Sequence, residues 1–251
     1  MSAGLQVVFE DEHCLAVVKP AGQFTQGDWA PPGETTLEQD VRRRLNPDAP
    51  ESAYVGIVHR LDRPVSGVLI WAKNPKAARR LATQFEKRQT IKEYWAIVEG
   101  VGDSPSTRSA GSGSAIFPSP EEVWEDWLLP ADSSGVVRSA REGDRGARRA
   151  VTRVLRDEAE RIPEGCLWLR LWPETGRTHQ LRVQSASRGM PILGDATYGS
   201  RRVFVGGVAL HARALQVRHP TLSTRLVLAA PLPQSWEEQG VVIPGSQVSS
   251  R

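Results

Sequence analysis

Asp62 stands out among the acidic residues because it lies between two arginines. It belongs to the stretch His59–Gly67, HRLDRPVSG, in which Arg60 and Arg63 flank it, and this polar stretch separates two apolar ones. Loops between strands often carry chemistry, and an ionised carboxylate there can act as a nucleophile. The same residues also fit a loop aspartate in a structural salt bridge, so the pattern alone leaves both interpretations open.

A second polar cluster lies in the stretch TGRTHQLR. Its candidate residues are Arg177, Thr178, His179, Gln180 and Arg182. Thr178 as N-cap and Gly189 as C-terminal cap predict a short helix, although the alternation of polar and apolar residues from 179 to 184 also suits a strand. Arg182 then lies near a helix N-terminus, where a carboxylate docks favourably. A capped, solvated helix start is the alternative interpretation.

Several other chemistries lack their sequence patterns. No GxxxxGK[ST] phosphate loop is present, and Gly111 and Gly113 lie in a Ser-rich segment rather than between a strand and a helix. Pro64 and Val68 occupy the glycine positions that a nucleophile elbow at Ser66 requires. None of the five histidines has a zinc-type spacing to other ligands. We therefore expect neither nucleotide hydrolysis nor a metal site.

Short strands dominate the elements that must position these residues. Strands are predicted at 5–9, 14–18, 54–58, 68–72, 94–98, 150–155 and 166–172. Helices are predicted at 37–45 and, after an Asn74 N-cap and Pro75, over the following turns. This order predicts an α+β fold with a mixed, mainly antiparallel sheet, flanking helices and loops, and a central active-site cleft.

The chain length of 251 residues fits one large domain or two closely fused halves. We expect a single catalytic domain over 1–240 made of two sub-halves, with long Gly/Ser-rich and then charged loops around one or two short elements at about 100–149, and a polar, disordered tail at 241–251. The net charge of +3 is a weak sign of a polyanionic partner. Cys14 and Cys166 fit buried thiols of a reducing compartment, and the alternative is a single disulfide between them. No leader or membrane segment is evident, so we expect a cytoplasmic protein.

Several motifs occur together in an order that resembles the RluA-type RNA pseudouridine synthases. They are HRLD with the following SG, Lys92 with Tyr94, TGRTHQLR, GMPILGDATYG and LHARALQVRHP. The resemblance extends from about Val7 to Trp236. It implies the pseudouridine synthase fold and an isomerase that converts uridine in tRNA or rRNA to pseudouridine, without a cofactor and by flipping the base out of the RNA.

The resemblance also implies roles for single residues. Asp62 matches the family's catalytic aspartate, Tyr94 its active-site tyrosine, and Arg182 the basic residue that pairs with the aspartate and would lower its pKa. Arg60 matches the arginine associated with displacing the flipped uridine. The other motif residues that we expect to bind substrate are Leu61, Arg177, His179 and Gln180.

Departures from the family pattern leave alternatives open. Val65 replaces a commoner Thr, and Gln184 with Ser185 stands where His-Leu is usual. We also expect no preceding RNA-binding domain of the S4 type, and a monomer. A non-catalytic RNA-binding or RNA-folding factor on the same scaffold is the second hypothesis. Glycoside hydrolysis would need a second carboxylate, and the nearest motif acid, Asp195, fits a turn better.

Overall fold

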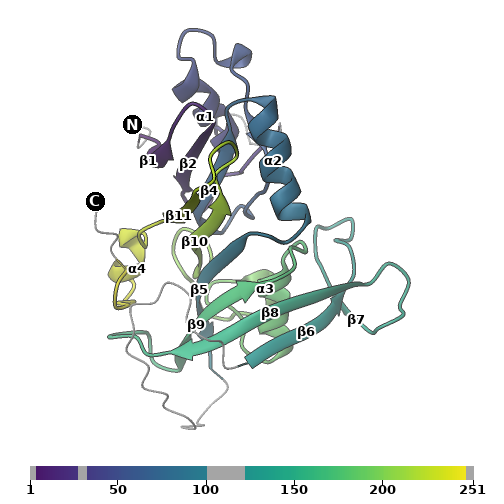
Figure 1. Cartoon of the computed structure of the whole chain (residues 1–251). Helices are drawn as coiled ribbons and strands as arrows, with labels where there is room; N and C mark the ends of the chain where they lie inside the picture. The colour runs from purple at the N-terminus through teal and green to yellow at the C-terminus, as the bar shows by residue number, and fades with distance from the viewer. Residues whose placement is uncertain (1–3, 28–32, 101–121, 247–251) are drawn as a thin grey trace. The chain divides into compact units, whose positions relative to one another are not determined.

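The computed structural model describes residues 4–27, 33–100 and 122–246 (Figure 1). The chain forms two compact units, the first from residues 1–92 with 212–231 and the second from residues 93–211 with 232–251. The chain therefore passes between the units within strand β5 (Ile91–Glu99), within strand β10 (Leu210–Arg218) and again after Pro231.

The first unit is built on an antiparallel sheet with helices beside it. Its further elements are β1 (Gln6–Glu10), β2 (Cys14–Lys19), α1 (Leu37–Leu45), the short 3-10 turn η1 (Pro50–Ser52), β3 (Gly56–Ile57), β4 (Ser66–Ala72), α2 (Pro75–Glu86) and β11 (Arg225–Ala229). Strands β1, β2 and β4 pair antiparallel, β10 lies next to β4, and β11 pairs with β10. β3 pairs with the end of β4 through Gly56 and Ile57, so the strand expected at 54–58 is shorter than predicted.

Local sequence explains where the elements of this unit begin. Asn74 caps α2 by accepting the Ala77 N–H at 2.9 Å, with Pro75 in the first turn, as the sequence predicts. All residues of β4 are buried, which is why it appears as an unbroken apolar run. Gly67 in β4 has φ +127°, and a Cβ there would collide with the backbone of Ala212 in β10. The glycine of the SG pair is therefore required by packing.

The second unit holds the remaining sheet strands. Besides β5 and the start of β10, its elements are β6 (Glu122–Leu128), β7 (Ser139–Ala140), β8 (Arg148–Asp157), β9 (Cys166–Pro173), α3 (Gln180–Ser187), η2 (Ala196–Tyr198) and α4 (Gln234–Glu238). The strands are ordered β5-β9-β8-β6-β7, and all of these pairings are antiparallel. The mixed, mainly antiparallel architecture predicted from the sequence is confirmed.

Helix α3 differs from the prediction at its first residue. The expected N-cap, Thr178, is wrong: His179 precedes the helix, in the left-handed region at φ 53°, and no side chain caps the helix. Thr178 is exposed, whereas Gln180 to Ser185 are all buried. The predicted end is correct, since Gly189 follows the helix at φ +70°.

Two regions can be compared with their loop predictions. The region 100–149, predicted as long loops around one or two short elements, holds strands β6 and β7 and the first residues of β8, while its Gly/Ser-rich part at 101–121 lies outside the described residues. The expected tail begins too early, because Val241 and Ile243 are buried and Val242 bridges to Arg161. Residues 247–251 lie outside the described part. Among the described residues, every helix is too short or too polar to cross a membrane.

Candidate active site

The loop that carries Asp62 joins β3 to β4 in the first unit, and Thr25 fixes it on one side. The Thr25 hydroxyl donates a 2.7 Å hydrogen bond to the Leu61 carbonyl and accepts one of 3.3 Å from the Leu61 N–H. Thr25 and Leu61 are both buried, whereas Asp62 is half-buried. One side chain therefore holds both polar backbone groups of the residue directly before Asp62.

Lys19 fixes the same loop on the other side of Asp62. Its Nζ, at the end of β2, donates to the carbonyls of Pro20, Gln23 and Arg63 at 2.8, 2.7 and 3.0 Å. Burial lowers the pKa of Lys19 to about 7, and the Asp62 carboxylate acts in the opposite direction. Because these carbonyls together need three N–H donors, the positively charged ammonium is the form that holds this loop.

The other residues of the HRLD stretch separate into structural and exposed ones. His59 Nε2 accepts the Ile70 N–H at 3.0 Å, and its ring stacks on Phe85 with the ring centres 4.5 Å apart. Burial, with the nearby positive charge of Lys92, lowers the pKa of His59 to about 3, so this imidazole is neutral. Arg60, by contrast, is exposed. Of the two, only Arg60 is placed to reach a ligand in solution.

Arg182 is held in the second unit by Asp195, an acid that the sequence indicated only as part of a turn. Its Nε and one terminal nitrogen donate to the two carboxylate oxygens of Asp195 at 2.6 and 2.8 Å. Both residues are buried, with 5% and 1% of their surface exposed. A bidentate pair of this kind fixes the plane of the guanidinium as well as its position. Asp195 is thus an ion-pair partner as well as part of a turn.

Tyr198 links Arg182 to His179. The Arg182 guanidinium lies over the Tyr198 ring, 4.9 Å from its centre, and the Tyr198 hydroxyl is 2.7 Å from His179 Nδ1. The GDATYG motif therefore supplies both the acid and the aromatic ring that hold Arg182. His179 reaches Tyr198 from its left-handed position just before α3.

The expected substrate contact of Gln180 is not supported. Its buried amide oxygen accepts from the Thr175 hydroxyl at 2.7 Å and from the Arg177 N–H at 3.0 Å. Its amide nitrogen donates to the Val151 carbonyl at 3.0 Å and to the Thr152 hydroxyl at 2.9 Å. An amide side chain has no further strong hydrogen-bond position, so Gln180 holds the start of α3 in place.

Arg177, the other residue expected at this end of α3, keeps part of its surface open. It is half-buried, and its Nε donates to the Arg149 carbonyl at 3.1 Å. This bond ties the start of α3 to the start of β8. The position of Arg177 therefore remains compatible with a contact to a ligand.

The departure at Gln184 has a structural explanation. This buried amide accepts from the Thr152 hydroxyl at 2.6 Å and donates to the Asp126 carboxylate at 2.7 Å, which ties α3 to β8 and β6. The hydroxyl of Ser185 is buried without a hydrogen-bond partner in the described part of the chain. Gln184 therefore belongs to the packing of α3 rather than to a ligand site.

Tyr94 is half-buried on β5, opposite Leu171 of β9. Its neighbour Glu93 is 1% exposed and accepts from Arg170 at 2.7 and 2.8 Å and from the Trp95 indole at 2.7 Å. A buried ion pair with good geometry is costly to disrupt. It therefore fixes β5 at the residue next to Tyr94.

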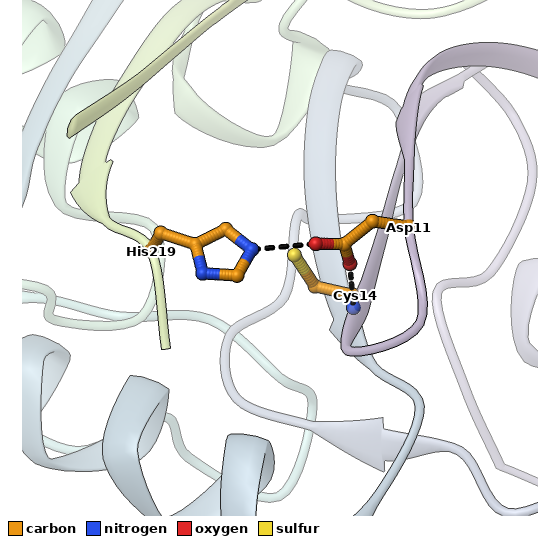
Figure 2. Close-up of side chains that lie close together, drawn as sticks. All are labelled: Asp11, Cys14 and His219. Carbon is orange, nitrogen blue, oxygen red and sulfur yellow. Dashed lines mark hydrogen bonds and ion pairs between the residues drawn. The ribbon is translucent and has the colours of Figure 1, made fainter. Parts of the chain in front are cut away.

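A third cluster of polar residues combines Asp11, Cys14 and His219 in the first unit (Figure 2). Their candidate ligand atoms lie within 4.8 Å of one another, a proximity that sequence spacing could not show. His219 Nε2 lies 2.6 Å from the Asp11 carboxylate, while Nδ1 accepts the N–H groups of Thr221 and Leu222 at 3.2 and 2.9 Å. The proton must then be on Nε2, the atom that would face a metal ion.

Other groups around this cluster also favour a hydrogen-bonded structural site. Burial raises the pKa of the Cys14 thiol to about 12, so the thiol stays protonated and is a poor ligand. The Lys73 ammonium donates to the Asp11 carbonyl at 2.7 Å, which places a positive charge nearby. We interpret the cluster as a link between the turn after β1 and the turn after β10.

The structure therefore groups the predicted residues by unit. Leu61 and Asp62 lie with Arg60 on one fixed loop of the first unit, and Arg182 and His179 share Tyr198 in the second. The residues missed from the sequence are Lys19, Thr25, Asp195 and Tyr198. Lys19 and the two GDATYG residues lie in motif-like stretches, but their roles depend on contacts distant in sequence.

Cys14 and Cys166 are both free and buried, as predicted.

Comparison with known proteins identifies the family. The sequence model described as RNA pseudouridylate synthase matches residues 13–187. The chain is 31% identical over 242 residues to a protein named tRNA pseudouridine synthase C of Yersinia pestis, covering 93% of this chain and 88% of that one. It is 38% identical over 238 residues to a protein of Zymomonas mobilis named as an uncharacterized RNA pseudouridine synthase, covering 94% of this chain and 97% of that one.

Solved structures show the same fold. Human RNA pseudouridylate synthase domain containing 4 superposes with a TM-score of 0.67 at 22% identity, over 96% of this chain and 95% of that chain. Human RNA pseudouridylate synthase domain containing 1 gives 0.68 at 24% identity, over 95% and 88%. The expected α+β pseudouridine synthase fold and the RluA-type resemblance are both confirmed. The chain belongs to the RNA pseudouridylate synthase family, whose members are isomerases that convert uridine in RNA to pseudouridine.

Proposed function

We propose that this enzyme modifies uridine in tRNA or ribosomal RNA with Asp62 as its catalytic carboxylate. The relative from Yersinia pestis is named for tRNA, and one from Vibrio cholerae, 31% identical over 239 residues, is named for the ribosomal large subunit. The observation that carries the assignment to Asp62 is the fixed loop, in which Thr25 holds Leu61 and Lys19 holds Arg63. Catalysis by a positioned group requires this kind of prior orientation.

The reaction needs a nucleophile but no external reagent. The bond from N1 to C1′ breaks, a bond from C5 to C1′ forms, the C5 proton leaves and N1 gains a proton. Atoms and electrons balance within the nucleoside, so a cofactor or oxidant is not required. The Asp62 carboxylate can add to C1′ or to C6, and either covalent route detaches the base and lets it rotate.

Tyr94 and Arg182 take the supporting roles. We assign Tyr94 the stacking surface for the flipped uracil and a part in removing the C5 proton. We assign Arg182 the role of the basic residue that pairs with the catalytic aspartate, as the family resemblance implies. Arg182 is suited to this role because Asp195 and Tyr198 keep its guanidinium in one orientation.

Substrate binding requires the uridine to leave the RNA stack. Arg60 is exposed and suits displacement of the base, while Leu61 shapes the loop beside it. Arg177 and His179 are half-buried at the start of α3 and suit contacts to the RNA. A monomeric state, a cytoplasmic location and the lack of a metal requirement stay predictions, which size-exclusion chromatography, fractionation and assay with a chelator can test.

The experiment that tests this function is pseudouridine mapping. Purified protein is incubated with unfractionated tRNA and, separately, with ribosomal RNA made in cells that lack the gene, and pseudouridine is mapped at nucleotide resolution. We expect at least one new site with wild type and none with Asp62→Ala. The RNA-binding factor is favoured instead if Asp62→Ala complements a deletion strain and wild type makes no pseudouridine in any RNA.

A further inference from the structure

The loop between β6 and β8, residues 129–147, is folded rather than irregular. Figure 1 shows it projecting beyond the strands, next to the β7 label. Asp132 Oδ1 accepts the N–H groups of Ser134 and Val136 at 2.9 and 3.1 Å, which closes one turn. Asp144 Oδ2 accepts the Arg141 N–H at 2.8 Å, which closes another. Asp132 and Asp144 are thus occupied by the backbone of the loop, while Glu142 in the second turn is exposed.

Positive charge is concentrated on this loop and the start of β8. The exposed arginines are Arg138, Arg141, Arg145, Arg148 and Arg149. Arg149 pairs with Glu125 at 2.6 Å, and Arg138 lies 3.5 Å from Asp132. Among the described residues, the side chains of Arg141, Arg145 and Arg148 form no ion pair. A folded loop therefore presents cations whose charge is available to a polyanion.

Val137 anchors the loop to the part of the second unit that holds Arg182. It is 2% exposed and packs with Leu128, Ala150 and Val183, the last of which follows Arg182 in α3. Its N–H donates to the Tyr198 hydroxyl at 3.0 Å. The same tyrosine ring lies under the Arg182 guanidinium. Tyr198 is therefore shared between the arginine-rich loop and Arg182.

We infer that loop 129–147 is a phosphate-binding surface for the substrate RNA and that Tyr198 is the positioning residue that joins this surface to Arg182. The inference rests on the proposed function, because it assumes that the bound polyanion is RNA. The ring of Tyr198 holds the guanidinium, and its hydroxyl holds the loop through Val137. RNA bound at the loop then lies at a fixed position relative to Arg182.

The first test measures how salt weakens RNA binding. We expect Arg141→Gln/Arg145→Gln to bind unfractionated tRNA more weakly and to lower the slope of log affinity against log salt concentration by about 2, one for each phosphate that an arginine no longer neutralises. The matched control is Arg43→Gln/Arg44→Gln, which also removes two exposed arginines, but ones paired at 3.0 Å with Asp40 and Glu10. Equal slopes for wild type and the loop variant would overturn the inference.

The second test separates the hydroxyl of Tyr198 from its ring. Tyr198→Phe keeps the ring near Arg182 and removes the bond to Val137, so we expect KM for tRNA to rise roughly fivefold, as for removal of an ordinary hydrogen bond, with a smaller effect on kcat. Hydrogen exchange at the Val137 amide should become faster, a change that removal of the bond to His179 alone would not produce. Unchanged exchange at Val137 would overturn the anchoring role.

The binding test and the activity test fail separately. If wild type makes pseudouridine while the loop variant keeps its salt slope, the loop inference is wrong and the proposed function stands. If wild type makes no pseudouridine in any RNA but the loop variant has a smaller slope, the proposed function is wrong and the loop remains an RNA-binding surface.

Discussion

Single residues determine how well the reactive groups are held. Asp62 has buried side chains bonded to the backbone on either side of it, and Arg182 has a buried carboxylate and an aromatic ring. The sequence motifs, through their resemblance to the family, indicate Asp62, Tyr94 and Arg182 as the catalytic residues. Asp195 lies in the motif GMPILGDATYG, but its pairing with Arg182 is not evident from that motif. Thr25 could not be found in this way, because a threonine with a distant partner has no local pattern.

Removing the charge of Asp195 should destabilise the protein strongly. Asp195→Asn leaves the buried Arg182 guanidinium with one carboxylate fewer, and we expect the free energy of unfolding in urea to fall by about 3–5 kcal/mol. Glu174→Gln is the control, because the Arg153–Glu174 pair is about half exposed. Similar losses for both variants would contradict a supporting role for Asp195, and a double variant Arg182→Met/Asp195→Leu should recover much of the stability.

Thr25 should affect catalysis through Asp62. Thr25→Val keeps the shape of the side chain but leaves the Leu61 N–H and carbonyl without their partner. We expect a loss of about 1–3 kcal/mol in unfolding free energy and a fall in kcat of roughly tenfold or more, because misplaced groups react slowly. Thr25→Ser restores the hydroxyl and should restore kcat. A valine variant with the kcat of wild type would show that the loop orients itself without Thr25.

At the scale of elements, capping and periodicity predicted α1, α2 and most strands at nearly the correct residues. The start of α3 was predicted wrongly because its polar residues act through distant partners: Gln180 and Gln184 bond to β8 and β6 instead of facing water. The sequence predicted one or two short elements within 100–149 but did not place strand β6, because exposed and buried residues do not alternate regularly along it. Tertiary contacts decided both cases.

The turns after β1 and β10 should depend on Asp11 in a pH-dependent way. Burial alone would raise the pKa of Asp11, but the backbone N–H groups of Cys14 and His13 and the bond to His219 outweigh it and lower the pKa from 3.8 to about 2. A depressed pKa means that ionised Asp11 stabilises the fold by about 2 kcal/mol above pH 4, and that this contribution is lost as the pH falls towards 2.

Asp11→Asn tests this contribution directly. We expect the variant to be less stable than wild type by about 2 kcal/mol at pH 7, with a difference that shrinks as the pH falls below 4. Thermal or urea unfolding across pH 2–7 measures the difference, where the protein refolds reversibly. A constant difference over this range would show that the Asp11 carboxylate is not the group responsible.

For the whole molecule, the order of motifs along the chain predicted more than any one of them. Composition and charge indicated only a polyanionic partner weakly, whereas the ordered set from HRLD to LHARALQVRHP indicated the family, and the comparisons confirm it. The sequence predicted two sub-halves but not their boundaries, because the chain changes unit inside β5 and β10. A strand that continues across such a boundary gives no sign of it in its sequence.

The central claim is that Asp62 performs the chemistry, and single-turnover kinetics on an RNA carrying a mapped target uridine tests it most directly. Asp62→Asn keeps the size of the side chain and the backbone groups that Lys19 and Thr25 bind, but it removes the carboxylate that raises the pKa of Lys19, so wild type and variant are compared at a pH below the Lys19 pKa of about 7. We predict that under these conditions the variant binds the RNA and unfolds in urea like wild type but forms no pseudouridine. Pseudouridine formation by Asp62→Asn at the rate of wild type would contradict the account.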